Sequence, residues 1–224
     1  MKKFAVLFDM DGVIVDTNPA HKKAILQFCD TYNKRLSDDE MKKYIWGRTN
    51  KEWLRHLFGE DLADAQMRRY ADEKEQLFRD IYEPDIKLLN GLVSFLDMLE
   101  QHNIPKAIGT SAPRANVDFV FKHTGIEKYF ATVLDETFVT IGKPNPEIYL
   151  KAAKALSFDP ADCIVIEDSL AGIESGKRAG CKVIGITTTH SSVELSHADL
   201  TAADFTQLSI EDLTTLFKSS AYGT

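Results

Sequence analysis

Seven polar side chains in this sequence could together handle a divalent cation and a phosphoryl group. They are Asp9, Asp11, Thr110, Ser111, Lys143, Glu167 and Asp168. If the four carboxylates converge, they repel one another unless a divalent cation and the lysine neutralise them, and oxygen ligands favour Mg²⁺. The two hydroxyls could bind the oxygens of a phosphoryl group whose charge the cation and the lysine screen. The set predicts metal-assisted phosphoryl transfer.

Short apolar runs precede most of these residues and predict buried strands. The runs cover residues 4–8, 104–108, 131–134, 163–166 and 182–186. Segments with helical spacing separate them, for example residues 170–177 after the N-cap residue Ser169. Alternating strands and helices are typical of an α/β fold, here a Rossmann-like doubly wound parallel sheet. Because ligands bind beyond the carboxyl ends of such strands, the polar residues there should meet at one edge.

An inserted helical-bundle cap domain is predicted after the first strand. Amphipathic helical patterns cover residues 20–32, 38–45, 51–58 and 62–82, with no convincing strand among them. We therefore expect a cap at residues 18–84 and a catalytic core at residues 1–17 and 85–224. The cap should sit over the carboxyl edge of the sheet on hinges near Asp16-Thr17 and Pro84, which places the site between two domains. The tail, residues 218–224, is expected to be frayed.

Composition argues against several other classes. The 27 basic residues are outnumbered by 34 acidic ones, no basic run occurs, and nucleic acid is therefore not an expected partner. The three cysteines lie far apart without a CxxC pair, which favours reduced thiols and a cytoplasmic location. The apolar stretch before Asp9 is too short for a signal peptide or a membrane span, so we expect no membrane association. We expect a monomer or a weak homodimer.

Four segments carry a resemblance to a known family. They are residues 9–17 (DMDGVIVDT), the apolar run that ends in Thr110, residues 142–146 (GKPNP) and residues 165–173 (VIEDSLAGI). In type and order they resemble the four motifs of the haloacid dehalogenase-like hydrolases, over nearly the whole chain. The helical insert resembles the small α-helical cap of the subgroup that contains phosphoglycolate phosphatases and beta-phosphoglucomutase.

The resemblance implies a role for each acidic residue. Asp9 matches the nucleophile that attacks phosphorus and forms an aspartyl phosphate. Asp11 matches the general acid/base, which protonates the leaving oxygen and later activates water. The Asp9 carboxylate, the backbone carbonyl of Asp11 and Asp168 match the ligands of Mg²⁺, with Glu167 in or next to the ligand set.

The remaining matches concern the phosphoryl oxygens and the substrate. Thr110 and Lys143 match the residues that hold these oxygens, Lys143 can also contact Asp9, and Ser111 replaces Thr110 if the strand register is off by one. In the cap, His21 and Lys74 stand at positions resembling those that contact substrate and catalytic acid.

Two further features of the cap concern its arginine and its tryptophans. Arg48 follows a glycine, which suits a bidentate contact with a phosphate or a carboxylate. Trp46 and Trp53 are spaced by seven residues, which indicates packing within the cap.

The favoured function is Mg²⁺-dependent hydrolysis of a small phosphorylated metabolite, such as a sugar phosphate. A phosphosugar mutase shares every core residue and is the alternative. The mutase-like relatives carry an arginine where the alignment places Asn50, which weakens that alternative. Dehalogenation and a non-catalytic phosphate sensor are less favoured, because neither requires an acid at Asp11.

Overall fold

The computed structural model describes residues 3–45 and 48–218. Within them, the core is a six-stranded sheet in the order β3-β2-β1-β4-β5-β6, and every pair of neighbouring strands is parallel. The strands are β1 (Ala5–Phe8), β2 (Lys106–Gly109), β3 (Thr132–Leu134), β4 (Cys163–Glu167), β5 (Lys182–Ile186) and β6 (Leu200–Ala202). The predicted α/β fold is confirmed. The edge strand β6 was not predicted, because its three residues, of which only Ala202 is buried, form no apolar run.

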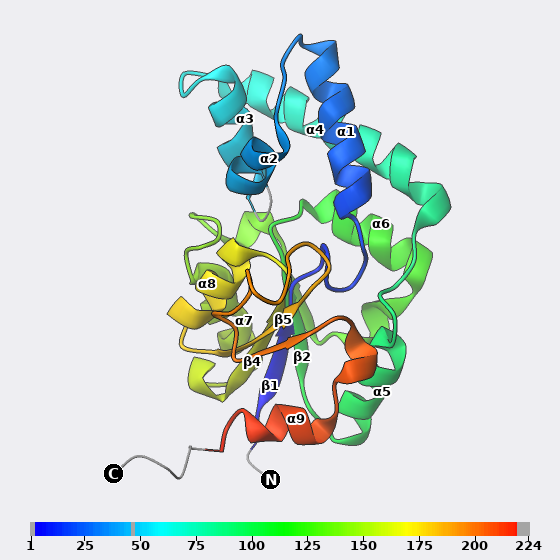
Figure 1. The fold of residues 1–224 in the computed structure, drawn as a ribbon, viewed down its shortest axis with the longest axis vertical. Coiled ribbons are helices and arrows are strands. Elements are labelled where there is room, and N and C mark those ends of the chain that lie inside the picture. The colour runs from blue at the N-terminus through cyan, green and yellow to red at the C-terminus, as the bar shows by residue number, and fades with distance from the viewer. Residues whose placement is uncertain (1–2, 46–47, 219–224) are drawn as a thin grey trace.

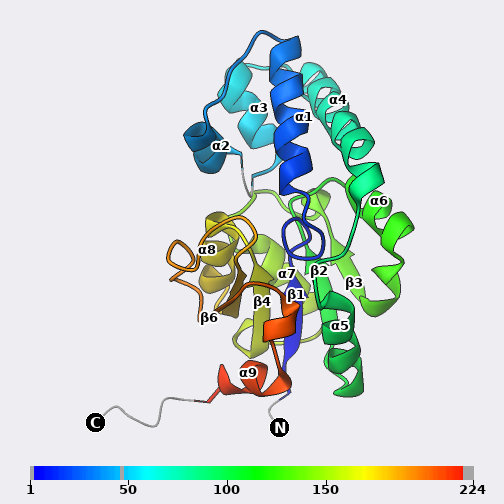
Figure 2. The ribbon, with the colours of Figure 1, turned by 45° about the vertical axis from the view of Figure 1, so that its right-hand side comes forward.

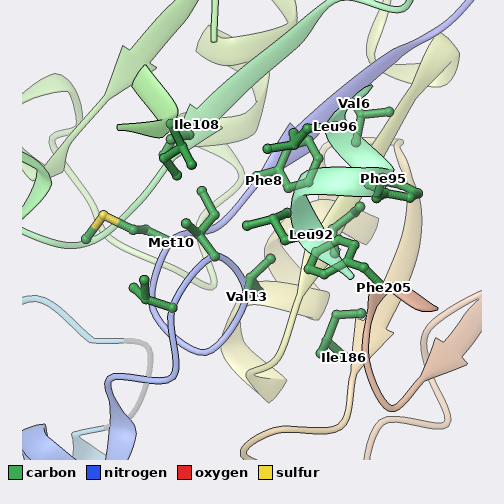
Figure 3. Close-up of a cluster of buried hydrophobic side chains, with 14 of the residues drawn as sticks. Val6, Phe8, Met10, Val13, Leu92, Phe95, Leu96, Ile108, Ile186 and Phe205 are labelled. Carbon is green, nitrogen blue, oxygen red and sulfur yellow. The ribbon is translucent and has the colours of Figure 1, made fainter. Parts of the chain in front are cut away.

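Helices cover both faces of the sheet, which explains why its central strands are apolar throughout. On one face, Val6 and Phe8 belong to an apolar cluster with α5 (Leu92–Gln101), α6 (Arg114–Thr124) and α9 (Ile210–Thr215). On the other, Ala5 and Leu7 pack with α7 (Glu147–Ala155) and α8 (Leu170–Arg178). Phe8 lies near both Phe95 and Phe205, whose ring centroids are each 6.2 Å from its own, in the cluster drawn in Figure 3.

Among the described residues, four helices of the segment proposed as the cap lie above the sheet in Figures 1 and 2. They are α1 (Asn18–Thr31), α2 (Asp38–Tyr44), α3 (Asn50–Phe58) and α4 (Asp64–Tyr82). Their apolar faces bury a cluster of their own, which includes Phe28, Trp53 and Tyr70. This separate cluster supports the proposed division into cap and core. Trp53 is buried there, as predicted, whereas Trp46 and the end of the tail, residues 219–224, lie outside the described residues.

Short 3₁₀ segments complete the connections: η1 (Glu83–Asp85), η2 (Ile126–Tyr129), η3 (Glu136–Phe138), η4 (Pro160–Asp162) and η5 (Phe205–Gln207). All three cysteines are free and buried. Among the described helices, none has the length and apolar character to cross a membrane.

Candidate active site

The turn after β1 holds Asp9 and Asp11 at the carboxyl edge of the sheet. The Asp9 N–H donates to the carbonyl of Ile166 at 3.0 Å, which extends the pairing of β1 with β4. Met10, between the two aspartates, is fully buried in the apolar cluster below (Figure 3). Gly12 closes the turn at φ +74°, a conformation that glycine adopts without strain. The apolar anchor therefore fixes two carboxylates beside one pocket.

Lys143 is a buried cation that bridges two carboxylates. Its Nζ donates to Asp9 Oδ1 at 2.8 Å and to Glu167 Oε1 at 2.6 Å. Burial alone lowers the pKa of Lys143, but the charges of Asp9 and Glu167 and their hydrogen bonds outweigh it, so the pKa is raised. The lysine is therefore charged at neutral pH, and its contact with Asp9 is as expected.

Glu167, at the end of β4, is fully buried and hydrogen bonded at both oxygens. Oε1 also accepts from the Tyr149 hydroxyl at 2.7 Å. Oε2 accepts from the backbone N–H groups of Asp168 and Ser169 and from the Ser169 hydroxyl. These contacts make Glu167 a residue that positions Lys143, beside the candidate metal ligands.

Asp9, Glu167 and Asp168 form an acidic cluster that fits a hard divalent cation. Each offers an oxygen, and these oxygens lie within 4.8 Å of one another. Burial raises the pKa of Asp9 to about 7, although the charge of Lys143 lowers it in part. Burial and the charges of Glu167 and Asp9 raise the pKa of Asp168 well above its usual value. A cation would relieve this repulsion, and buried carboxylates are ligands that Mg²⁺ prefers.

Asp168 is oriented by two residues that the sequence did not single out. Asn18, at the start of the cap, donates to Asp168 Oδ2 at 3.2 Å, and the Thr189 hydroxyl donates to the same oxygen. Asn18 also donates to the Thr189 hydroxyl oxygen. The cap thus reaches the acidic cluster through its first residue.

Thr110 and Ser111 follow β2 and both line the pocket. Thr110 is buried, and its hydroxyl oxygen accepts from the Ala112 N–H at 3.1 Å, which leaves the hydroxyl proton for a ligand. Ser111 is half-buried. The hydroxyl of either residue can face a phosphoryl oxygen, and Thr110 stays the preferred candidate.

Asp11 contacts the cap residue His21. His21 Nε2 lies 3.6 Å from Asp11 Oδ1, and the Thr17 hydroxyl donates to the same oxygen at 2.7 Å. Burial raises the pKa of Asp11, but the hydrogen bonds from His21 and Thr17 and the charge of His21 outweigh it, so the pKa is lowered. The His21 ring stacks on Phe78, with centroids 3.7 Å apart, and its Nδ1 lies 3.3 Å from Lys74 Nζ.

The predicted cap residues His21, Arg48 and Lys74 all line the same pocket as Asp9. Arg48 NH1 lies 3.7 Å from Glu52 Oε1. Glu52 Oε2 accepts from the backbone N–H and the hydroxyl of Thr49, which fixes the start of α3 beside Arg48. The cavity holds about 80 Å³, which is below the few hundred Å³ typical of small-molecule sites.

Seven polar residues of the site were given no role there from the sequence: Thr17, Asn18, Asn50, Glu75, Asn116, Tyr149 and Thr189. Thr17 ends the first motif segment and Asn50 was noted only at the position of the mutase arginine. The partners of the other five lie mostly on other elements, so neither spacing nor a motif marks them. Glu75 lies on a helix with many charged residues, and this sequence pattern predicts that its side chain is exposed to solvent.

The chain belongs to the haloacid dehalogenase-like hydrolases, whose family model matches residues 6–186. It is 32% identical over 216 residues to hexitol phosphatase A from Escherichia coli, covering 91% of this chain and 92% of that protein. It is also 32% identical over 192 residues to beta-phosphoglucomutase from Bacillus subtilis, covering 81% and 82%.

Other relatives are longer, and the fold has solved counterparts. A bifunctional riboflavin kinase/FMN phosphatase from Arabidopsis thaliana is 31% identical over 85% of this chain, which spans 50% of that protein. The chain thus spans about half the length of this curated relative. The crystal structure of a family IA HAD hydrolase from Entamoeba histolytica superposes with a TM-score of 0.87 at 34% identity, covering 96% of this chain and all of that one.

Proposed function

We propose that this protein is a Mg²⁺-dependent phosphatase that hydrolyses a small phosphorylated metabolite through an aspartyl phosphate on Asp9. One observation carries the proposal: Lys143 joins Asp9 to Glu167, two members of the acidic cluster, and Asp11 follows Asp9 by two residues. This arrangement offers a nucleophile, a fixed cation and an acid/base in one cavity. The phosphatases among the relatives support the reaction class.

The metal would be held by the carboxylates of Asp9 and Asp168 and the backbone carbonyl of Asp11, with Glu167 in or next to the ligand set. When bound, Mg²⁺ would neutralise part of the negative charge that a phosphoryl group brings to four carboxylates. Lys143 supplies a second positive charge, and Thr110 or Ser111 a hydroxyl donor, for the phosphoryl oxygens.

In the first step the Asp9 carboxylate attacks phosphorus, the bond to the leaving oxygen breaks, and Asp11 gives that oxygen a proton. In the second step water attacks the phosphorus of the aspartyl phosphate, Asp11 takes a proton from this water, and phosphate leaves with Asp9 restored. Asp11 therefore acts as the acid in the first step and as the carboxylate base in the second. The proton taken from water there is the one donated in the next cycle.

The leaving group would lie on the cap side of the pocket, against His21, Arg48 and Lys74. The hinges near Asp16-Thr17 and Pro84 would let the cap open for substrate and close over the aspartyl phosphate. The hexitol phosphatase relative supports a phosphorylated carbohydrate as the substrate. A cytoplasmic monomer or weak homodimer without nucleic-acid or membrane partners stays our expectation.

A phosphosugar mutase is the second candidate, favoured by the beta-phosphoglucomutase relative. There a sugar hydroxyl, rather than water, would attack the aspartyl phosphate. The sequence resemblance places Asn50 where mutase-like proteins carry an arginine, and the Asn50 amide is hydrogen bonded to Glu75 and Trp53. The absence of an arginine at this position supports hydrolysis.

The test is phosphate release from a panel of sugar phosphates, phosphoglycolate, nucleotides and pyrophosphate, with Mg²⁺ and then with EDTA. We expect metal-dependent release that Asp9→Asn abolishes while its circular dichroism spectrum matches the wild type. Beta-glucose 1-phosphate is assayed in parallel, and glucose 6-phosphate formed without free phosphate would establish the mutase instead. Undiminished activity of Asp9→Asn would rule out the nucleophile assignment.

A further inference from the structure

Glu75 is a buried carboxylate on the leaving-group side of the cavity, and three donors hold it. Its Oε1 accepts from Lys74 Nζ at 2.5 Å and from Asn50 Nδ2 at 2.8 Å. Its Oε2 accepts from Asn116 Nδ2 at 2.6 Å. Lys74 and Asn50 belong to the cap, whereas Asn116 lies on α6 of the core. Glu75 is therefore a contact between the two domains inside the pocket.

The side-chain amides of Asn50 and Asn116 can present only their N–H groups to Glu75. The indole N–H of Trp53 donates to Asn50 Oδ1 at 2.9 Å, and Arg79 NH1 donates to Asn116 Oδ1 at 2.9 Å. Because an indole and a guanidinium only donate, each amide oxygen is committed to them and each NH₂ turns to the carboxylate. Burial raises the pKa of Glu75, but the charges of Lys74 and His21 and the hydrogen bonds from Lys74 and Asn116 outweigh it and lower the pKa to about 2. The surroundings are thus built for a charged Glu75.

This charge removes the excess positive charge from the cap side of the pocket. Among the described residues, the cap contributes one lysine and one arginine to this pocket. Lys74 is paired with Glu75, and Arg48 lies 3.7 Å from Glu52. Lys74 is therefore not free to balance a second phosphate, and a phosphate placed beside it would meet the Glu75 carboxylate. Hydroxyl groups could accept from Lys74 and donate to the unused acceptor capacity of Glu75.

We propose that Glu75 selects the substrate class: a monophosphate with an uncharged, hydroxyl-bearing leaving group is accepted, and a second phosphate is rejected. This inference rests on the proposed phosphatase function. It also bears on the mutase alternative, since attack by a hydroxyl of a sugar monophosphate on the aspartyl phosphate gives a sugar bisphosphate. A pocket that rejects bisphosphates cannot hold that species.

The test compares two sugars of one skeleton as competitive inhibitors of p-nitrophenyl phosphate hydrolysis with Mg²⁺. For the wild type we expect fructose 1,6-bisphosphate to inhibit at least about tenfold more weakly than fructose 6-phosphate, because a buried carboxylate repels the extra charge. Glu75→Gln should reduce this ratio to near one, and Glu75→Asp, which keeps the charge, should retain it. Asp72→Asn removes one charge from an exposed position of the same helix and should leave the ratio unchanged.

Equal inhibition of the wild type by the two sugars would overturn the inference, as would no inhibition by either sugar. A Glu75→Gln ratio equal to that of the wild type would do so as well. The wild-type ratio decides the matter even where Glu75→Gln does not fold. Failure of the wild type to hydrolyse p-nitrophenyl phosphate with Mg²⁺ would instead refute the proposed phosphatase, and the inference with it.

Discussion

Gly172→Ala should disable the site without touching any residue that contacts substrate. Gly172 lies in the first turn of α8, and a Cβ atom there would stand 1.8 Å from both Cδ and Oε1 of Glu167. Carbon atoms in contact normally stay about 3.5–4.0 Å apart, so the Glu167 carboxylate must move. Its movement would disturb the hydrogen bonds from Lys143 and Tyr149.

The expected cost follows from those two hydrogen bonds. A hydrogen bond to a charged group contributes about 1.5–3 kcal/mol, so losing both costs roughly 3–6 kcal/mol. Replacing glycine by alanine in a helix returns at most about 1 kcal/mol. We therefore expect the free energy of unfolding of Gly172→Ala to fall by about 2–5 kcal/mol. A displacement of Lys143 by about 1 Å should also lower kcat/KM by on the order of 100-fold.

Urea unfolding and phosphate release, measured on the same samples, check both effects. Gly125→Ala is the matched control, because Gly125 has φ +67° and its added Cβ would meet nothing within 4 Å. That variant should lose only about 1–2 kcal/mol from the left-handed backbone and keep its kcat/KM. Gly172→Ala with wild-type stability and kcat/KM would refute the positioning of Lys143 by Glu167.

Two further predictions concern single carboxylates. Asp11→Asn should slow both formation and hydrolysis of the aspartyl phosphate, which rapid-quench kinetics would resolve; an unchanged second step would contradict its role as the base. Burial, followed by the charges of Glu75 and Asp135, raises the pKa of Glu136 to about 7. Between about pH 4.5 and 7 the folded state therefore binds one proton more than the unfolded state. The folded state loses stability as the pH rises through that window. Glu136→Gln should therefore be about 1 kcal/mol more stable than the wild type at pH 8 and equally stable near pH 4. If the curves of thermal midpoint against pH for the variant and the wild type ran parallel, this prediction would be contradicted.

The core of the site could be predicted because its residues follow buried strands. Asp9 and Glu167 end apolar runs, and parallel strands bring their carboxyl ends to one edge whatever lies between them in sequence. Lys143 precedes a helix rather than following a strand. The glycine and proline on either side of it indicated that it is a site residue. The four cap helices follow from their amphipathic patterns, with starts within two residues of those expected.

The polar network of the cap could not be predicted, because its contacts depend on how the cap is placed over the core. Asn18 and Asp168 are 150 residues apart, and no periodicity relates them. Glu75 lies on α4 and Asn116 on α6, and the sequence around each is typical of a solvated helical residue, although the fold brings the two together. The strand β6 escaped notice for a different reason, since only its last residue, Ala202, is buried.

The central claim is the covalent intermediate on Asp9, and trapping it is the most direct measurement. The Asp11→Asn variant is mixed with Mg²⁺ and p-nitrophenyl phosphate, quenched in acid and analysed by peptide mass spectrometry. We expect the peptide containing Asp9 to gain the mass of one phosphoryl group, and we expect this gain to disappear when Asp9→Asn is added. Phosphate release by the Asp11→Asn variant with an unmodified Asp9 peptide would contradict a covalent intermediate on Asp9.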